Sequence, residues 1–170
     1  MQLFIPYQSY EQSAQALDDK RLNKQIIEAA QIASTAFWIN NCQKAEFLTS
    51  PLRTNPIYFP THEHRLLCRW ASENKENFLH VVHLGFACAI EYEFRFKKFH
   101  KTLITLGRLF AYYHNIKFKN YPSPQPNCTT NHRYVEDTNE AYQRELNLKW
   151  FYDISFPTWT KRDVPKFYQN

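Results

Sequence analysis

The chain has 170 residues, of which 44% are hydrophobic and 22% are charged, a composition that suits one soluble globular domain and excludes a disordered chain. No apolar run reaches the roughly 20 residues of a membrane span, and the first residues lack the pattern of a signal peptide, so we expect a cytoplasmic protein without a membrane partner. The net charge of +5 and the 17% aromatic content favour a nucleic-acid partner, because cations contact phosphates and rings stack on unpaired bases.

Glycine is scarce, occurring only at Gly85 and Gly107, and long periodic stretches separate the prolines. These features predict a single all-α domain over residues 1–170, a bundle of about five helices with one long loop and an irregular aromatic C-terminal tail. The four cysteines are scattered without the paired spacing of a zinc site or a redox motif. We therefore expect neither a metal nor a cofactor.

Residues 1–6 are predicted to form a short extended segment, in which Leu3 and Ile5 alternate with other residues and Pro6 ends the pattern. A short helix through Leu17 should follow, before the main helix begins near Asp18 or Asp19. Because the extended segment directly precedes these helices, the N-terminus is expected near the functional site.

The stretch from Asp18 to Phe37 is amphipathic when read as a helix, with a polar strip opposite its apolar core face. Ile27 and Ile32 flank the strip where a solvated face would continue with charge, so the strip is predicted to line a cleft. In the alternative interpretation this is a surface helix with an ordinary i, i+4 ion pair. Arg21 lies just beside the strip and adds a cation that cannot be deprotonated. The strip consists of Lys20, Lys24, Glu28, Gln31 and Thr35.

Between Asn40 and Thr61 the hydrophobic residues follow neither a helical nor a strand period, and prolines and asparagines are frequent. Long loops in compact domains are usually functional or disordered, so Arg53, Tyr58 and Phe59 are expected to face a substrate. His62 and His64 follow, but side chains two residues apart on a helix diverge. A metal site is therefore not predicted there.

Residues 63–100 are predicted to form one long helix, kinked near Gly85. Its apolar residues, among them Ile90 and Phe94, should be buried. The polar residues recur at i+3 and i+4 intervals and could equally form a solvated face or a binding face. They include Asn77 and the pair Glu91 and Arg95, which is spaced for an ion pair.

The rest of the chain is predicted to contain two further helices and two irregular segments. A helix should run from Lys101 to about Tyr113, and another from Val135 to Phe151. A proline-rich connector over residues 120–131 separates them. The tail from Pro157 onward is rich in aromatic residues and should be docked on the domain.

A resemblance to a known family rests on several blocks of the chain. The residues Asp19-Lys20-Arg21, Lys24, Glu28, Ala30-Gln31 and Ser34-Thr35-Ala36 resemble the first-helix signature of the pyrimidine-dimer DNA glycosylases, the endonuclease V-like family. Later blocks resemble a phage-encoded branch of that group. These are Pro60-Thr61-His62, Trp70, Glu76-Asn77-Phe78, the run from Glu91 to Lys101, Glu140-Ala141-Tyr142, Trp159, Lys161-Arg162 and Pro165.

The resemblance implies an all-helical single domain that binds DNA, extrudes a base from the duplex and cuts its glycosidic bond, with abasic-site lyase activity as a further expectation. We expect the protein to be a monomer. In that family an amine attacks the sugar C1′ and a glutamate assists. Glu28 best matches this glutamate in function, although it stands about one helical turn later than in the best-studied member. Arg21 and Lys24 match the phosphate contacts. Further candidate contacts to DNA are Gln31, Thr35, His62, Asn77, Glu91, Arg95, His100, Lys101, Trp159 and Arg162.

The nucleophile departs from the family pattern, which uses the α-amine of a small second residue. Gln2 is bulky and should leave Met1 in place. Three possibilities follow: the Met1 amine attacks, a desolvated Lys20 or Lys24 attacks, or the chain lacks lyase chemistry. An α-amino group titrates near pH 8, closer to working pH than a lysine does.

Two other functions fit the same residues. One is a transferase or hydrolase that acts on a modified phage base or a nucleotide. The other is a non-catalytic nucleic-acid-binding module whose polar strip only contacts phosphates.

Overall fold

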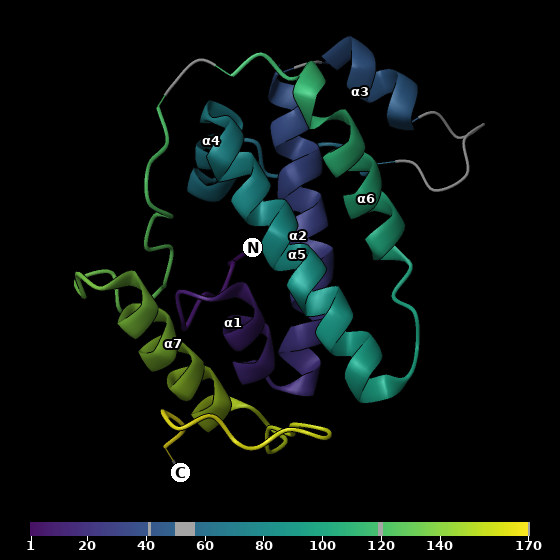
Figure 1. Cartoon of the computed structure of the whole chain (residues 1–170). Coiled ribbons are helices and arrows are strands. Elements are labelled where there is room, and N and C mark those ends of the chain that lie inside the picture. Colours follow the sequence, from purple (N-terminus) through teal and green to yellow (C-terminus); the bar gives the residue numbers. More distant parts are fainter. Residues whose placement is uncertain (41, 50–56, 119–120, 170) are drawn as a thin grey trace.

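The computed structural model describes residues 1–40, 42–49, 57–118 and 121–169. Within these ranges the chain forms seven α-helices, one 3₁₀ turn and no β-strand, which confirms the predicted all-α fold (Figure 1). No helix in the described ranges is long and apolar enough to cross a membrane. The elements are α1 (Tyr10–Ala16), α2 (Asp19–Asn40), α3 (Cys42–Thr49), α4 (Leu66–Glu73), α5 (Lys75–Phe96), α6 (Thr102–Tyr112), η1 (Tyr113–Asn115) and α7 (Thr138–Tyr152).

The central helix of the bundle is α2, which contacts α3, α4, α5 and α6 (Figure 1). Its core face is rich in alanine, and Ala29 and Ala33 are fully buried, so neighbouring helices approach closely. At Gly85 of α5 an added Cβ would lie 2.9 Å from Leu106 and 3.1 Å from the Cβ of Ala29. This glycine therefore marks close packing of three helices, and α5 continues through it as one uninterrupted helix.

The predicted long helix over residues 63–100 is divided at Asn74. This residue has extended backbone angles, φ −144° and ψ 152°, and its side chain accepts a hydrogen bond from the Glu76 amide at 2.7 Å. Asparagine is a preferred N-cap because its side chain satisfies an orphan amide of the helix start. The break therefore separates α4 from α5 at a cap that periodicity alone did not reveal.

The segment predicted as a long loop contains α3, which was not expected. Beyond it, Ile57 is buried and Tyr58 points its hydroxyl at Thr102 Oγ1, 3.0 Å away. The predicted substrate-facing role of Tyr58 is therefore replaced by packing against α6. Arg53 lies outside the described residues.

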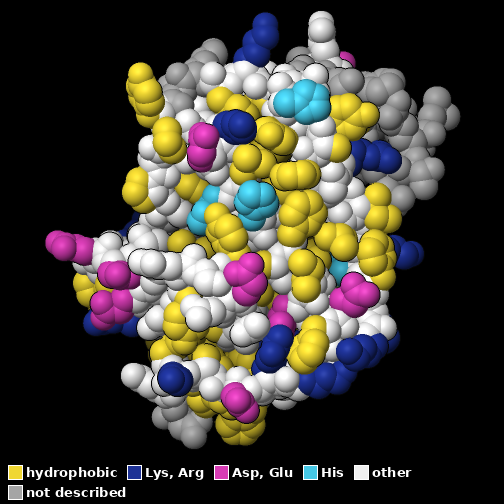
Figure 2. All heavy atoms as spheres, viewed as in Figure 1, with side chains coloured by type: hydrophobic (Ala, Val, Ile, Leu, Met, Phe, Trp, Pro, Cys, Tyr) yellow, Lys and Arg dark blue, Asp and Glu magenta, His cyan; other side chains and the backbone are white. Residues whose placement is uncertain are grey.

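Two apolar residues of α5 that were predicted to be buried are exposed. Ile90 is 66% exposed and Phe94 is 40% exposed. Both line a groove of about 480 Å³ between α5, α1 and the tail residue Arg162. On the face viewed in Figure 2, hydrophobic side chains gather over α5 and α6.

The aromatic tail is docked on the domain, as its composition predicted. The Phe167 ring stacks on Trp150 of α7, with ring centroids 5.8 Å apart. Trp159 donates its indole N–H to the carbonyl of Ala16 at 2.9 Å. The tail thereby joins α7 to the turn between α1 and α2.

Candidate active site

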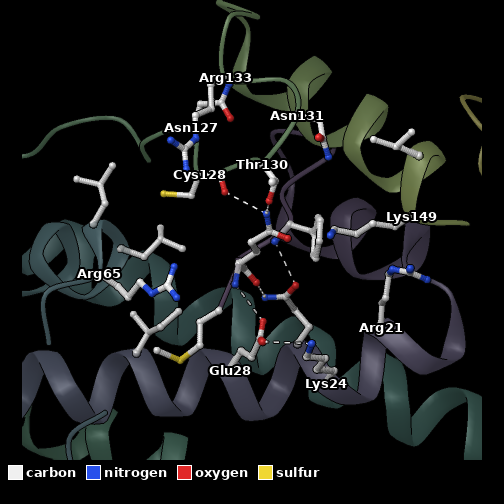
Figure 3. Close-up of a pocket in the computed structure, with 18 of the residues that line it drawn as sticks. Arg21, Lys24, Glu28, Arg65, Asn127, Cys128, Thr130, Asn131, Arg133 and Lys149 are labelled. Atoms are coloured by element: carbon white, nitrogen blue, oxygen red, sulfur yellow. Dashed lines mark hydrogen bonds and ion pairs between the residues drawn. The ribbon is translucent and has the colours of Figure 1, made fainter. Parts of the chain in front are cut away.

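A hollow of about 1030 Å³ opens beside the N-terminal half of α2. Figure 3 shows Lys24 and Glu28 rising into it from α2, with Arg65 on one side and Lys149 on the other. We call it the N-terminal hollow because Met1 and Gln2 lie in it. Its other polar lining residues are Lys20, Arg21, Gln25, His64, Asn127, Cys128, Thr130, Asn131, Arg133, Tyr152 and Asp153, together with Cys68.

The hollow follows part of the polar strip that was predicted to line a cleft. Lys20, Lys24 and Glu28 line it, whereas Gln31 and Thr35 do not. Thr35 is fully buried, and its hydroxyl donates to the Thr61 carbonyl at 3.2 Å and accepts from the Thr61 amide at 3.0 Å. Thr35 thus fixes the chain before α4 and is closed to the substrate contact predicted for it.

Glu28 is held on the α2 side of the hollow by two unequal contacts. Its Oε2 accepts a hydrogen bond from the backbone amide of Gln2 at 3.2 Å. Its Oε1 lies 3.7 Å from Lys24 Nζ, and the Lys24 side chain is 72% exposed. The i, i+4 ion pair of the alternative interpretation therefore exists, but it is loose and lies beside a cavity.

The N-terminal segment is fixed in place by two glutamines. Gln25 of α2 donates to the Gln2 carbonyl at 3.4 Å and accepts from the Phe4 amide at 3.1 Å. From the other side, Gln125 donates to the Leu3 carbonyl at 2.9 Å. The first residues are thus clamped in extended form, and the chain end is directed into the hollow.

The amino group of Met1 must lie close to Glu28. Consecutive backbone nitrogens are at most about 3.7 Å apart, and the Gln2 nitrogen is 3.2 Å from Glu28 Oε2, so the amine is within about 7 Å of that carboxylate. Burial raises the pKa of Cys68 to about 11 and also raises the pKa of Cys128, while the positive N-terminus lowers both in part. The amine therefore lies where its charge reaches both thiols.

Positive groups outnumber negative ones around the hollow. Six lysine or arginine side chains and the Met1 amine line it, against the two carboxylates Glu28 and Asp153. Asp153 is already neutralised by Lys20 at 3.2 Å and Arg21 at 2.8 Å. The remaining excess of cations is suited to bind an anion such as a phosphate.

Arg65 and Arg133 are lining residues that the sequence did not reveal. The exposed Arg65 side chain forms no ion pair with the described residues, and Arg133 donates only to the Thr129 carbonyl, at 3.0 Å. By contrast Arg21 is buried and also pairs with Asp18 at 3.1 Å. Arg21 therefore holds Asp153 at the edge of the hollow, and Arg65 and Arg133 are better placed to bind an anion.

A second cluster contains three other predicted DNA contacts, away from the hollow. Arg95 has no exposed side-chain surface, and it reaches Glu91 at 2.7 Å and Asp19 at 3.0 Å. Arg162 of the tail binds Glu91 at 2.8 Å. We call these four residues the Arg95 network. Arg95 also donates to the Leu17 and Gln15 carbonyls at the end of α1, so its role is to join helices.

Hydrogen bonds hold the pKa of both carboxyls in this network below the ordinary value. Burial alone would raise the pKa of Glu91, but hydrogen bonds from Arg162 and Arg95 lower it further than burial raises it. For Asp19 burial is likewise opposed by hydrogen bonds from Thr160 and Arg95. Both carboxylates are therefore stabilised in the ionised form.

Two further predicted contacts serve backbone groups. Asn77 is buried and donates its side-chain amide to the Trp70 carbonyl at 3.0 Å. Trp159 holds the Ala16 carbonyl, as described above. Neither residue lines the hollow.

The remaining predicted contacts lie on other parts of the surface. His62 is exposed with a positive φ of 55°. His100 is 3.1 Å from the side-chain oxygen of Asn23, and Lys101 is exposed just before α6. None of them lines the N-terminal hollow. Among the described residues no three histidine, cysteine or acidic side chains group together as a metal site would require.

Comparison with known proteins found no relative: no family model, no curated protein and no solved structure matches this chain.

Proposed function

We propose that this protein is a monomeric cytoplasmic DNA glycosylase with abasic-site lyase activity. It would draw one nucleotide from a duplex into the N-terminal hollow and break the bond between base and sugar. The observation that carries this proposal is the placement of the Met1 amine within about 7 Å of the Glu28 carboxylate. A nucleophilic amine beside a carboxylate, in a cationic cavity, is what glycosidic attack on DNA needs.

Binding is supported by the charge and size of the hollow. Arg65, Arg133 and Lys24 are free to contact phosphates on either side of an extruded nucleotide. The volume of about 1030 Å³ lies just above the range of small-molecule sites, about 300–1,000 Å³. A base and its sugar therefore fit together with solvent.

The proposed chemistry uses the Met1 amine as nucleophile and Glu28 as proton carrier. The neutral amine attacks C1′, and the base leaves with the electron pair of the C1′–N bond and takes a proton from water. Glu28 then removes a proton from the attached nitrogen and returns it to O4′ as the C1′–O4′ bond opens, which leaves an iminium. For strand cleavage Glu28 takes a proton from C2′ and the 3′-phosphate departs.

The two lysines are less suited to the nucleophilic role. Lys20 has a 67% exposed side chain and its ammonium is paired with Asp153, and the Lys24 side chain is 72% exposed. A nucleophilic lysine needs desolvation to be neutral near pH 7. The geometry therefore favours Met1.

The test is base release from a panel of duplexes carrying dimerised, oxidised, alkylated or hypermodified bases. Glu28→Gln should lower the rate of release by at least about 100-fold and leave the dissociation constant for the duplex unchanged. Glu140→Gln is the matched control, because Glu140 is a half-exposed carboxylate of α7 paired with Arg144 outside the hollow. It should keep full activity.

Two results would contradict the proposal. Turnover of a free nucleotide, with no binding of duplex DNA, would indicate a transferase or hydrolase. Duplex binding without release of any base, in both wild type and Glu28→Gln, would indicate a non-catalytic module.

A further inference from the structure

Four large hydrophobic side chains are exposed in the six residues at the end of α7 and just beyond it. Phe151 and Tyr152 are 75% and 73% exposed, Phe156 is 92% exposed, and Ile154 is fully exposed. We call these four residues the apolar rim. They precede the docked aromatic tail, in the stretch where the chain leaves α7 (Figure 1). Contiguous exposed hydrophobic surface on a globular domain usually marks a binding surface.

The apolar rim is anchored to the edge of the N-terminal hollow. Asp153 stands in the middle of the rim, and its two oxygens bind Lys20 at 3.2 Å and Arg21 at 2.8 Å. Its amide donates to the Trp150 carbonyl, where α7 ends. Tyr152 and Asp153 also line the hollow itself. Asp153 therefore ties the backbone at the centre of the rim to the edge of the cavity.

The spacing along α2 between Arg21, which binds the rim, and Glu28, the candidate proton carrier, suits a nucleotide that has left the stack. Arg21, which holds the rim, and Glu28 are seven residues apart in α2, or about 10 Å along the helix axis. A nucleotide with its base in the hollow would leave a gap in the duplex beside it. The rim is an exposed hydrophobic surface at the edge of this hollow.

We propose that the apolar rim is a wedge that enters the base stack of duplex DNA and fills the space of the extruded nucleotide. This inference rests on the proposed function and specifies how the duplex is opened. Proteins are known to unstack a duplex by inserting apolar side chains between base steps. Extruding a nucleotide costs free energy of unstacking, and the inserted side chains would offset this cost. Lys20, Arg21 and Lys149 lie beside the rim, where the flanking phosphates would pass.

A second copy of the chain is a poorer occupant for this surface. A stable protein interface needs about 20–30 residues from each partner, whereas the rim spans six residues at a helix end. The neighbouring surface is the cationic hollow, which a second copy with net charge +5 would not neutralise. Charge and size both favour DNA.

The experiment compares single-stranded and duplex DNA as ligands of the double variant Ile154→Ala/Phe156→Ala. The probe is a duplex with a stable abasic analogue and 2-aminopurine as its neighbour, together with the same strand alone. The variant should bind the duplex at least about fivefold more weakly and the single strand within about twofold of wild type, because only the duplex has a stack to enter. The 2-aminopurine fluorescence at saturation should rise less than half as much as with wild type.

Ile90→Ala is the matched control, because Ile90 is an exposed hydrophobic residue in the groove on α5, outside the hollow. It should behave as wild type in both assays. Equal fluorescence rise in wild type and rim variant would overturn the wedge while leaving the glycosylase proposal intact. A change from dimer to monomer in the rim variant, seen by light scattering, would overturn it in favour of a protein interface. Failure of the wild type to bind any DNA would instead refute the proposed function.

Discussion

The N-terminal hollow and the Arg95 network contain the same residue types but differ in how completely those residues are bonded. Asp19 belongs to the network, and Lys20, the next residue, belongs to the hollow. Arg95 is wholly buried and bonded to two carboxylates and to backbone carbonyls. Lys24 is largely exposed and makes one loose contact at 3.7 Å. A cation that is fully bonded to carboxylates and carbonyls, such as Arg95, joins helices, whereas a cation with only a loose contact, such as Lys24, is available to a ligand.

This difference predicts a separation between stability and activity. Substitutions in the network should unfold the protein and leave the chemistry of the folded fraction intact. Substitutions in the hollow should lower the activity of the folded protein and leave its stability unchanged.

The largest effect is expected for Arg95→Met. The substitution takes from Glu91 one of its two arginine partners and from Asp19 its contact with Arg95, and breaking a buried ion pair in this way should destabilise the fold by about 3–5 kcal/mol. Urea unfolding followed by circular dichroism measures this loss. The control Arg144→Met removes an exposed ion pair of α7 and should show no measurable change. If Arg95→Met instead lowered base release per folded molecule without loss of stability, Arg95 would belong to the site.

Acid should weaken the network next. The folded-state pKa values of Asp19 and Glu91 lie below their ordinary values, so the stabilisation is complete above the unfolded values near pH 4 and is lost as pH falls through the folded ones. The melting temperature of wild type should therefore drop steeply below about pH 4. In Arg95→Met the drop should be shallower, and an identical pH profile would contradict the assignment.

The third prediction concerns the hollow. Arg65→Ala should weaken DNA binding evenly across sequences and reduce the slope of log affinity against log salt by about one, because one phosphate contact is lost. Lys75→Ala removes an exposed cation of α5 that lies over the Tyr113 ring, outside the hollow. It should leave the slope unchanged. Equal slopes for both variants and wild type would exclude Arg65 from the interface.

The smallest effect concerns the packing behind the hollow. In Gly85→Ala the new methyl group would crowd Leu106 and Ala29, so we expect about 1 kcal/mol of destabilisation after the gain in helix propensity is subtracted. In Gly107→Ala the methyl group meets nothing within 4 Å, and up to about 1 kcal/mol should be gained. Thermal unfolding should therefore show a lower melting temperature for Gly85→Ala and a higher one for Gly107→Ala, which checks the close packing of α5 on α2.

Periodicity was sufficient to predict the all-α fold and the position of α2, because its core face is uninterrupted. The flanking Ile27 and Ile32 also led correctly to a cavity beside Lys20, Lys24 and Glu28. Periodicity could not place the break at Asn74, because a cap is a single-residue feature within a continuing apolar pattern.

The sequence could not identify every residue of the candidate site, and the physical reason is a different one. Arg65 and Arg133 come from irregular segments that only the folded chain brings together. Arg95 looked like a ligand contact because its partner Asp19 is 76 residues away in sequence. Local patterns therefore indicated which cations exist, and long-range contacts decided which of them are free.

The most direct test of the central claim is borohydride trapping on duplex DNA with an abasic site, followed by peptide mapping of the adduct by mass spectrometry. Reduction of the iminium would fix the DNA to the attacking nitrogen. We predict an adduct on the α-amine of Met1 that is much reduced in Glu28→Gln. An adduct on Lys20 or Lys24, or no adduct under conditions where the protein binds the duplex, would contradict the account.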